Sequence, residues 1–278
     1  ISGEIRSCFG MTEPQNPGSN PVWMDTVAVK DGDDFVINGN KWFTSSADGA
    51  SICVVMAVTD PDAENKYSRA SMFVVPTDNP GFELVRNIPV MGDEGENYTS
   101  HAETKFTDCR IPSTHLIGEI GQGFMLAQQR LGPGRIHHCM RMIGQAERAL
   151  ELLCKRSTSR IAFGKPLAEL GGNYDVIADC RTEIEMCRLL TLKAAYMMDT
   201  VGNKIAKSEI AQIKVAVPSM VVRVIDKAIQ IHGGAGVSQD TPLARLFTST
   251  RFLRIGDGPD EVHRRAIARA ELSKYNSE

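Results

Sequence analysis

Asp257 has the surroundings of a side chain that could act as a general base. In the segment GDGPDEVHR this aspartate stands between two glycines, after an apolar run and just before a helix predicted from Asp260 to about Tyr275. Flanking glycines let a ligand approach the backbone closely, and Pro259 suits the first turn of a helix. A carboxylate in this position could accept a proton. The alternative is an aspartate that only forms the turn and caps the helix.

The first half of the chain contains two segments that could hold a ring or a phosphate. In MTEPQNPGSN, backbone N–H groups and the hydroxyls of Thr12 and Ser19 could contact a phosphate or the edge of a flavin, although a solvated loop explains the same residues. In NGNKWFTSS, a strand would place Phe43 and Ser45 on one face, where an aromatic ring beside a hydroxyl suits a ring-shaped ligand. The core of an ordinary β-sandwich accounts for this second pattern equally well.

Two segments of the second half could contact a cofactor. SRIAFGKPL carries Arg160, whose planar guanidinium suits pyrophosphate, although exposed arginines are common. QIHGGAGVS ends a predicted helix at paired glycines, which indicates either a glycine C-cap or a close approach of the backbone to a ligand. It is not a dinucleotide-binding fingerprint, because the spacing differs and the glycines end a helix rather than open one.

The composition is that of a folded protein without an evident nucleic-acid or metal site. Apolar residues make up 42% of the 278 residues, charged residues 23%, and the net charge is −3, without a basic stripe for nucleic acid. Seven cysteines without a C-x-x-C pair fit a reducing compartment, and we find no apolar run of membrane-spanning length. Four histidines show no metal-ligand spacing and are interpreted as structural: His137, His138, His232 and His263.

The pattern of apolar residues changes from alternating to helical near residue 118. Before it, short alternating or β-branched runs are separated by turn signals, among them an Asp-Gly turn and an Asn-Gly turn within residues 25–45. After Gly123, two seams step by three and four residues, as helices that pack together do. The first comprises Ile177, Cys180, Ile184, Cys187, Thr191, Ala194 and Met198, and the second Ile210, Ile213, Val217, Val221, Val224, Ala228 and Ile231.

These patterns predict an α+β protein of two domains. Residues 1–117 would form an antiparallel β-barrel or sandwich, and residues 118–278 an antiparallel four-helix bundle. Pro218 should kink its helix, and the LGPGR segment should break or bend an earlier one.

Taken together, the motifs resemble those of the acyl-CoA dehydrogenase family. MTEP…GS, INGNKWFTSS, AFGKP, QIHGGAGVS and GDGPDEVHR occur in that family's order and approximate spacing, over essentially the whole chain. RLGPGRIHHCMR and DGPDEVHR resemble the branch that contains family members ten and eleven. The family has an N-terminal helical domain, a middle β domain that binds flavin and a C-terminal four-helix domain, and this chain matches the last two. The resemblance therefore implies a longer native chain, in which a helical domain precedes Ile1.

The resemblance implies noncovalent FAD, bound partly across a subunit interface of a homotetramer arranged as a dimer of dimers. The positions that match the family's FAD contacts are Phe9, Met11, Thr12, Ser19, Phe43, Thr44, Ser45, Arg160, Phe163, Gln230, Gly233, Gly234, Pro259 and Glu261. Of these, Arg160 and the Gln230–Gly234 segment would serve the FAD of a neighbouring subunit.

The resemblance also implies where the acyl-CoA thioester and its base lie. Asp257 takes the place where much of the family has Glu, and free N–H groups of the next helix could polarise the thioester carbonyl. Other members carry the base on an earlier helix, where this chain has Gly134, so no second carboxylate competes. The positions expected near the substrate are Ser19, Gly132, Gly134, Arg135 and Gly258. In an apolar pocket, burial would raise the pKa of Asp257, and the helix N-terminus would oppose that.

The activity implied is dehydrogenation of a fatty acyl-CoA to a trans-2-enoyl-CoA, as in fatty acid β-oxidation and lipid metabolism. Electrons would pass to an electron-transfer flavoprotein. Two alternatives stay open: an acyl-CoA oxidase, in which oxygen takes the electrons, and a non-catalytic subunit or fragment that binds acyl-CoA.

Overall fold

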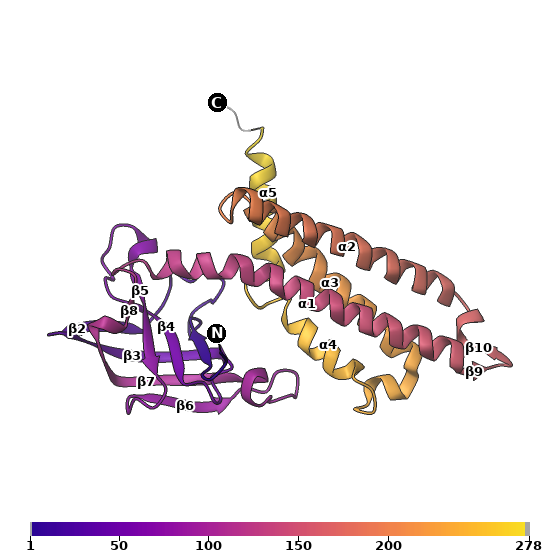
Figure 1. The fold of residues 1–278 in the computed structure, drawn as a ribbon, viewed down its shortest axis with the longest axis horizontal. Helices are drawn as coiled ribbons and strands as arrows, with labels where there is room; N and C mark the ends of the chain where they lie inside the picture. The colour runs from indigo at the N-terminus through magenta and orange to yellow at the C-terminus, as the bar shows by residue number, and fades with distance from the viewer. Residues whose placement is uncertain (1, 276–278) are drawn as a thin grey trace. The chain divides into compact units, whose positions relative to one another are not determined.

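The chain forms two compact units, each with its own core (Figure 1). The structure is a computed structural model and describes residues 2–275. The first unit ends at Gln129 and the second begins at Arg130, inside the long helix α1, Gly123–Ser159. A mixed α+β fold is therefore confirmed, whereas the domain division expected between residues 117 and 118 stays a prediction.

The first unit is built on eight strands. They are β1 Ser7–Gly10, β2 Val27–Asp31, β3 Asp34–Ser45, β4 Ile52–Val58, β5 Ala70–Pro76, β6 Phe82–Asn87, β7 His101–Pro112 and β8 Leu116–Ile117. They pair in the order β6-β7-β3-β2-β4-β5-β8, and β1 pairs with β4. β1 and β2 both run parallel to β4, and β2 meets β4 at one pair, Val27 with Val58. The described strands thus leave the sheet open rather than closed into a barrel, and the sandwich stays a prediction.

The two turn signals of the sequence have different outcomes. The Asp-Gly signal is confirmed, because β2 and β3 form a hairpin that closes at the pair of Asp31 with Asp34. The prediction of an Asn-Gly turn is wrong, because β3 runs straight through Asn38 and Gly39 and only shifts its register against β7 there. A Cβ on Gly39 would lie 2.6 Å from the backbone Cα of Thr26, so this glycine serves a close approach of two chain segments.

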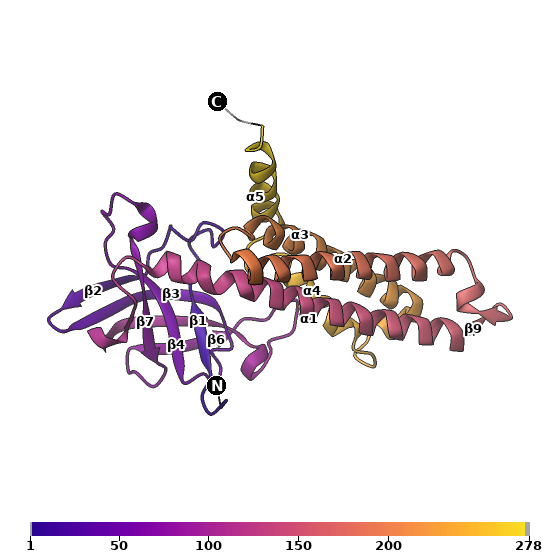
Figure 2. The ribbon, with the colours of Figure 1, turned by 45° about the horizontal axis from the view of Figure 1, so that its top comes forward.

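The second unit contains most of α1 and four further α-helices. They are α2 Asn173–Val201, α3 Lys207–His232, α4 Leu243–Phe252 and α5 Asp260–Leu272, with the short strands β9 Ile161–Ala162 and β10 Lys165–Pro166 between α1 and α2. Short 3₁₀ helices occur at Lys66–Ser68, Asn97–Thr99, Ser113–His115, Leu167–Glu169 and Gly233–Val237. In two views α1, α2 and α3 run alongside one another (Figures 1 and 2). The four-helix arrangement itself stays a prediction.

Both predicted helical seams lie in the core of the second unit. On α2, Cys180, Ile184, Cys187, Thr191 and Ala194 are buried, and all the seam residues of α3 from Ile210 to Ala228 are buried as well. α1 is continuous through Pro133 and α3 through Pro218, so the LGPGR segment does not break its helix, while a bend there and a kink at Pro218 stay predictions. No helix in the described part of the chain combines the length and apolar character that crossing a membrane requires.

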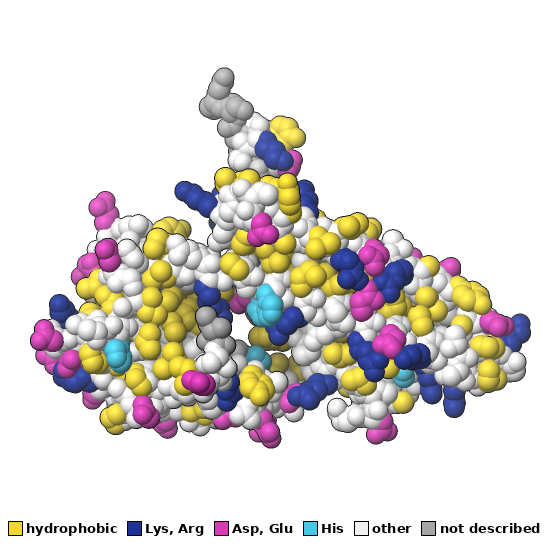
Figure 3. Space-filling view, viewed as in Figure 1, with side chains coloured by type: hydrophobic (Ala, Val, Ile, Leu, Met, Phe, Trp, Pro, Cys, Tyr) yellow, Lys and Arg dark blue, Asp and Glu magenta, His cyan; other side chains and the backbone are white. Residues whose placement is uncertain are grey.

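Charged side chains of both signs are interspersed over the helices of the second unit (Figure 3). Arg181 and Arg188 both pair with Glu147 and Glu185, which links α1 to α2. Such exposed networks contribute little each, so the apolar seams provide most of the stability of this unit.

A buried ion pair ties the MTEP loop to β3 in the first unit. Lys41 is 0% exposed and donates to Oε1 of Glu13 at 2.8 Å and to the carbonyl of Met11 at 3.0 Å. The second carboxylate oxygen of Glu13 accepts the backbone N–H of Asp25 at 2.6 Å. Burial alone would raise the pKa of Glu13, but the charge of Lys41 and the hydrogen bonds lower it to about 2. The pair therefore fixes the loop from both ends.

We predict that Lys41→Met destabilises the protein by about 3–5 kcal/mol, because it leaves Glu13 buried without its counter-charge. Urea unfolding at neutral pH measures this loss. The double variant with Glu13→Gln should recover part of it, and a Lys41→Met protein as stable as wild type would contradict the role of the pair. Since folding lowers the pKa of Glu13, its contribution is present above pH 4.5 and should be lost as the pH falls through about 2.

Candidate active site

The turn that carries Asp257 joins α4 to α5. Asp257 has a φ of +57°, in the left-handed region that residues other than glycine seldom occupy, and Gly258 follows with a φ of +103°. Helix α5 begins at Asp260, as the sequence predicts, with Pro259 at its N-cap. A strained backbone of this kind persists only where its surroundings hold it, and such positions gather at functional sites.

Side chains from three helices hold this turn. From α1, Nε of Arg135 donates to the carbonyl oxygen of Asp257 at 3.0 Å. From α5, Nε2 of His263 lies 3.2 Å from the same oxygen. From α3, Nζ of Lys214 donates to the carbonyl oxygen of Gly256 at 2.8 Å. The backbone of the turn is therefore fixed by groups that are distant from it in the sequence.

An ion pair between half-buried Arg254 and buried Asp260 closes the turn at its two ends. Nε and Nη2 of Arg254 donate to Oδ2 of Asp260 at 2.8 and 2.6 Å, and the N–H of Asp260 donates to the carbonyl of Arg254 at 3.2 Å. The sequence predicts that N–H groups of this helix are free to polarise a thioester. The N–H of Asp260 is already bonded, so it is not one of them.

The carboxylate of Asp257 lies near His138, Lys214 and Arg130 rather than in the apolar pocket expected from the sequence. Its Oδ2 lies 3.1 Å from Nε2 of His138, at ion-pair distance but without the alignment of a hydrogen bond. Burial alone would raise the pKa of Asp257, but His138, Lys214 and Arg130 outweigh it, and the pKa is lowered from its usual value. Burial thus acts in the expected direction, but neighbouring side chains rather than burial decide the sign of the shift.

Two glycines of α1 lie at this site or beside it. A Cβ on Gly134 would lie 3.9 Å from Oδ2 of Asp257, so a side chain at this position would meet the same carboxylate. A Cβ on Gly132 would fall 2.0 Å from Oδ1 of Asn203, so packing already explains that glycine. The structure brings Gly134, Arg135, Asp257 and Gly258 together, whereas the substrate role of Gly132 stays a prediction.

The residues predicted at the N-terminal end of the flavin site lie around the MTEP loop. Phe9 and Met11 are half-buried and pack against a small apolar cluster. The hydroxyl of Thr12 donates to the carbonyl of Trp42 at 2.7 Å, which joins the loop to β3. Ser19 is exposed. Contacts of these residues with a cofactor stay predictions.

An aromatic and polar group lies at the C-terminal end of β3. Phe43, with a φ of +50°, packs edge-on against Trp42 at a centroid distance of 5.0 Å. Its ring centroid lies 6.2 Å from that of His101, and Oγ of Ser45 lies 2.7 Å from Nδ1 of the same histidine. Phe43 and Ser45 therefore lie beside the same side chain. The hydroxyl of Thr44 is buried and lies 3.2 Å from that of Thr104 on β7, and its carbonyl accepts the N–H of Ala47 at 3.3 Å.

The remaining predicted contacts are mostly on the surface of the second unit. Phe163, at the tip of the β9–β10 hairpin, is 97% exposed and has a φ of +51°. The exposed members of this set are Arg160, Phe163, Gln230, Gly233, Gly234 and Glu261, and Pro259 is half-buried. A phenyl ring so exposed to water is typical of a surface that contacts another molecule.

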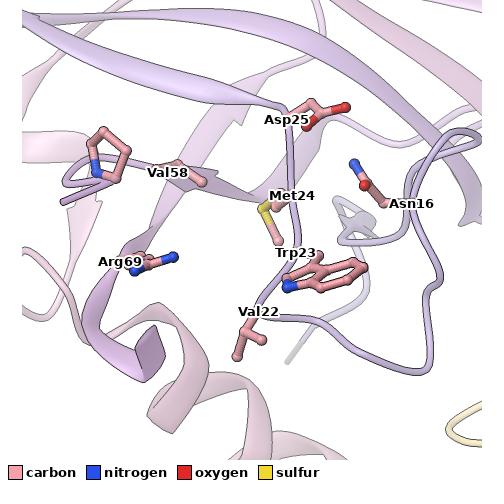
Figure 4. Close-up of a pocket in the computed structure, with 8 residues that line it drawn as sticks. Asn16, Val22, Trp23, Met24, Asp25, Val58 and Arg69 are labelled. Atoms are coloured by element: carbon pink, nitrogen blue, oxygen red, sulfur yellow. The ribbon is translucent and has the colours of Figure 1, made fainter. Parts of the chain in front are cut away.

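The first unit also has a cavity of about 300 Å³ (Figure 4). It is lined by Asn16, Val22, Trp23, Met24, Asp25, Val58, Pro61 and Arg69. The indole of Trp23 is 63% exposed, and the guanidinium of Arg69 points toward the cavity (Figure 4).

Sequence reasoning missed three residues next to the predicted ones. His138 and His263 were interpreted as structural, yet both contact Asp257. His138 stands four residues after Gly134, one helical turn along the same face, and this spacing could have drawn attention to it. Lys214 interrupts the apolar seam of α3, which was a second usable signal. Contacts between separate helices are not visible in any local pattern.

The chain belongs to the acyl-CoA dehydrogenase family. Residues 8–109 match the family model of the acyl-CoA dehydrogenase middle domain, and residues 121–272 match that of the C-terminal domain. Together these matches cover most of the chain.

Two relatives illustrate the similarity and its extent. The chain is 51% identical over its whole length to a Mycobacterium tuberculosis protein named "Probable acyl-CoA dehydrogenase FadE2", of which it spans 68%. It is 49% identical over 98% of its length to acyl-CoA dehydrogenase family member 11 of Gallus gallus, of which it spans 35%. The chain therefore matches only part of the length of each relative.

Solved structures share the fold. The butyryl-CoA dehydrogenase of Megasphaera elsdenii is 30% identical, with a TM-score of 0.87, and the match covers 97% of this chain and 69% of that one. An FAD complex of PigA is 25% identical, with a TM-score of 0.89, over 99% of this chain and 70% of the other.

We predict that Gly258→Ala destabilises the protein by about 1–3 kcal/mol, because the left-handed backbone disfavours a side chain. A Cβ there would also fall 2.8 Å from Nε2 of His263. Gly144→Ala in helix α1 is the matched control, since a Cβ there meets nothing within 4 Å. Thermal unfolding compares the two, and equal effects of both substitutions would show that the turn is not constrained.

Proposed function

We propose that the chain is the middle and C-terminal part of an FAD-dependent acyl-CoA dehydrogenase. The reaction is the α,β-dehydrogenation of a fatty acyl-CoA thioester to its trans-2-enoyl-CoA, a step of fatty acid β-oxidation. Family membership supports the class, and the arrangement around Asp257 supports the reaction.

The observation that carries the proposal is the meeting of Gly134 with Asp257. Members of the acyl-CoA dehydrogenase family carry the base at the position of Asp257, before the last helix, or at the position of Gly134 on an earlier helix. In this chain the two positions lie on α1 and on the α4–α5 turn, and a Cβ on Gly134 would be 3.9 Å from Oδ2 of Asp257. Side chains at the two positions would therefore reach the same place, and in this chain Asp257 provides the carboxylate there.

FAD is the cofactor that the family and the FAD-bound neighbours indicate. The side chains fit such a group. Trp42 and Phe43 form an aromatic pair beside Ser45 and His101, which suits a flavin ring. Arg160 offers an exposed guanidinium for pyrophosphate.

The chain's own residues account for the removal of the α-proton. Lys214 and Arg130 favour the ionised form of Asp257, and its carboxylate accepts the α-proton of the thioester. The electrons of that C–H bond form the new double bond as the β-hydrogen leaves with its electron pair. Bound FAD supplies the acceptor for this hydride. Arg135 and His263 hold the base in place through its carbonyl oxygen.

Simple assays distinguish a dehydrogenase from an acyl-CoA oxidase and from a non-catalytic binding subunit. We propose an electron-transfer flavoprotein as the partner that reoxidises the cofactor. An acyl-CoA oxidase would instead consume oxygen at the rate of turnover, and a non-catalytic subunit would bind acyl-CoA without bleaching the flavin. The ionised carboxylate at a base position favours a catalyst over a binding subunit.

Asp257→Asn should lower the rate of flavin reduction by acyl-CoA by about 10²–10⁴-fold, because it removes the base and keeps its shape. Stopped-flow absorbance of the FAD-loaded full-length protein measures the rate, and equilibrium titration should show near-normal binding of acyl-CoA.

The thermal midpoint of the same variant serves as its control. An aspartate that only shapes the turn would lower the midpoint and leave reduction fast. The variant Asp257→Gly with Gly134→Glu should recover part of the lost rate, since a carboxylate then returns from α1. A fast Asp257→Asn enzyme would overturn the assignment of the base.

We also propose a homotetramer in which Arg160 and Phe163 contact the FAD of a neighbouring subunit, as their exposure favours. Arg160→Ala should lower FAD retention at least tenfold, because a charge-assisted contact with phosphate is lost. Flavin absorbance after gel filtration measures retention. Arg223→Ala, which removes an exposed arginine paired with Glu183, is the control. A monomer with full FAD occupancy would contradict the proposal.

A further inference from the structure

Lys214 is a buried lysine in the middle of an apolar helix. It is 1% exposed, and its neighbours on α3 include the fully buried Ile213 and Val217. Burial lowers the pKa of Lys214, as expected for a cation removed from water. Burying an ammonium group is costly, and the apolar residues of α3 pack against the other helices without needing a charge at position 214.

The ammonium group of Lys214 is directed at the turn before Asp257. Nζ donates to the carbonyl of Leu253 at 2.7 Å and to the carbonyl of Gly256 at 2.8 Å. The carbonyl of Gly256 and the N–H of Asp257 belong to one planar peptide group. Lys214 therefore holds the peptide plane that precedes the base.

The peptide plane that follows the base is held separately. Its carbonyl oxygen is that of Asp257, which contacts Arg135 and His263. The angles φ and ψ of a residue are set by the orientations of the planes on either side of it. With both planes anchored, Asp257 keeps the unfavourable φ of +57° that directs its carboxylate.

We propose that Lys214 is a positioning residue for Asp257: by fixing the preceding peptide plane it sets the direction of the carboxylate that removes the α-proton. The inference rests on the proposed function. The charge of Lys214 also favours the ionised carboxylate, together with Arg130, Arg135 and His138 of α1, while His263 and Asp260 face the turn from α5.

The test uses the FAD-loaded full-length protein with Lys214→Met, Lys214→Gln and Lys214→Arg. The base is followed apart from hydride transfer by the exchange of α-hydrogen for deuterium in 3-thiaoctanoyl-CoA, in which sulfur replaces the β-carbon. We expect Lys214→Met to lower this exchange at least 100-fold with FAD content retained. Lys214→Gln, which can donate a hydrogen bond without charge, should lose less, and Lys214→Arg should retain most.

The pH profile separates positioning from mere stability. In Lys214→Gln the loss of a nearby cation should raise the pKa of Asp257, so the acid limb of the exchange rate moves to higher pH. Val217→Ala is the control, because it weakens the same buried helix without reaching the turn. It should lower the thermal midpoint and leave both the exchange rate and the acid limb unchanged.

Each outcome decides the inference. The role of Lys214 would be overturned if Lys214→Gln exchanged within twofold of the wild-type rate and its acid limb did not move. It would also be overturned if Val217→Ala lost as much exchange rate as the Lys214 variants. If Lys214→Met does not fold, the Gln and Arg variants decide by the same criteria. If Asp257→Asn exchanges as fast as wild type, the proposed base fails and this inference with it. If Asp257→Asn exchanges slowly while the Lys214 variants exchange at the wild-type rate, Asp257 remains the base and only the positioning role of Lys214 is rejected.

Discussion

The left-handed conformation of Asp257 is the constraint on which the candidate site depends. An aspartate adopts this conformation only against a local cost, so the fold must supply contacts that exceed it. These contacts come from Arg135 on α1, Lys214 on α3 and His263 on α5. The packing of the helices thereby becomes a requirement of the site, because loss of any one helix would release the turn.

Electrostatics at this turn favours the ionised form of the Asp257 carboxylate. A buried carboxylate among apolar side chains gains basicity but risks protonation, whereas one among cations stays charged and is a weaker base. The lowered pKa of Asp257 shows that the second arrangement is present.

The first unit uses a buried charge for a similar structural purpose. Lys41 anchors the carbonyl of Met11 and the carboxylate of Glu13, and the latter in turn binds the backbone of residues 25 and 26. In both units a buried lysine holds a loop that carries predicted site residues. A long cationic side chain suits this task, because it can reach backbone carbonyls that no neighbouring N–H group can satisfy.

The sequence by itself determined the class of elements, the seams of α2 and α3, the Asp-Gly hairpin and the start of α5, since these follow from local periodicity and turn chemistry. The order of its motifs also pointed to the family. It could not show that Asn38 and Gly39 form a register shift rather than a turn, because that depends on the approach of Thr26 from another segment. Nor could it show that α1 continues through Pro133.

The tertiary structure alone decided which groups meet Asp257. His138, Lys214 and His263 are separated from one another by dozens of residues, and only the packing of α1, α3 and α5 places them around one turn. The sign of the pKa shift follows from the same arrangement, because burial and neighbouring charge oppose each other and only distances show which prevails. Local sequence carries the identity of a charged residue but not the distance to its partners.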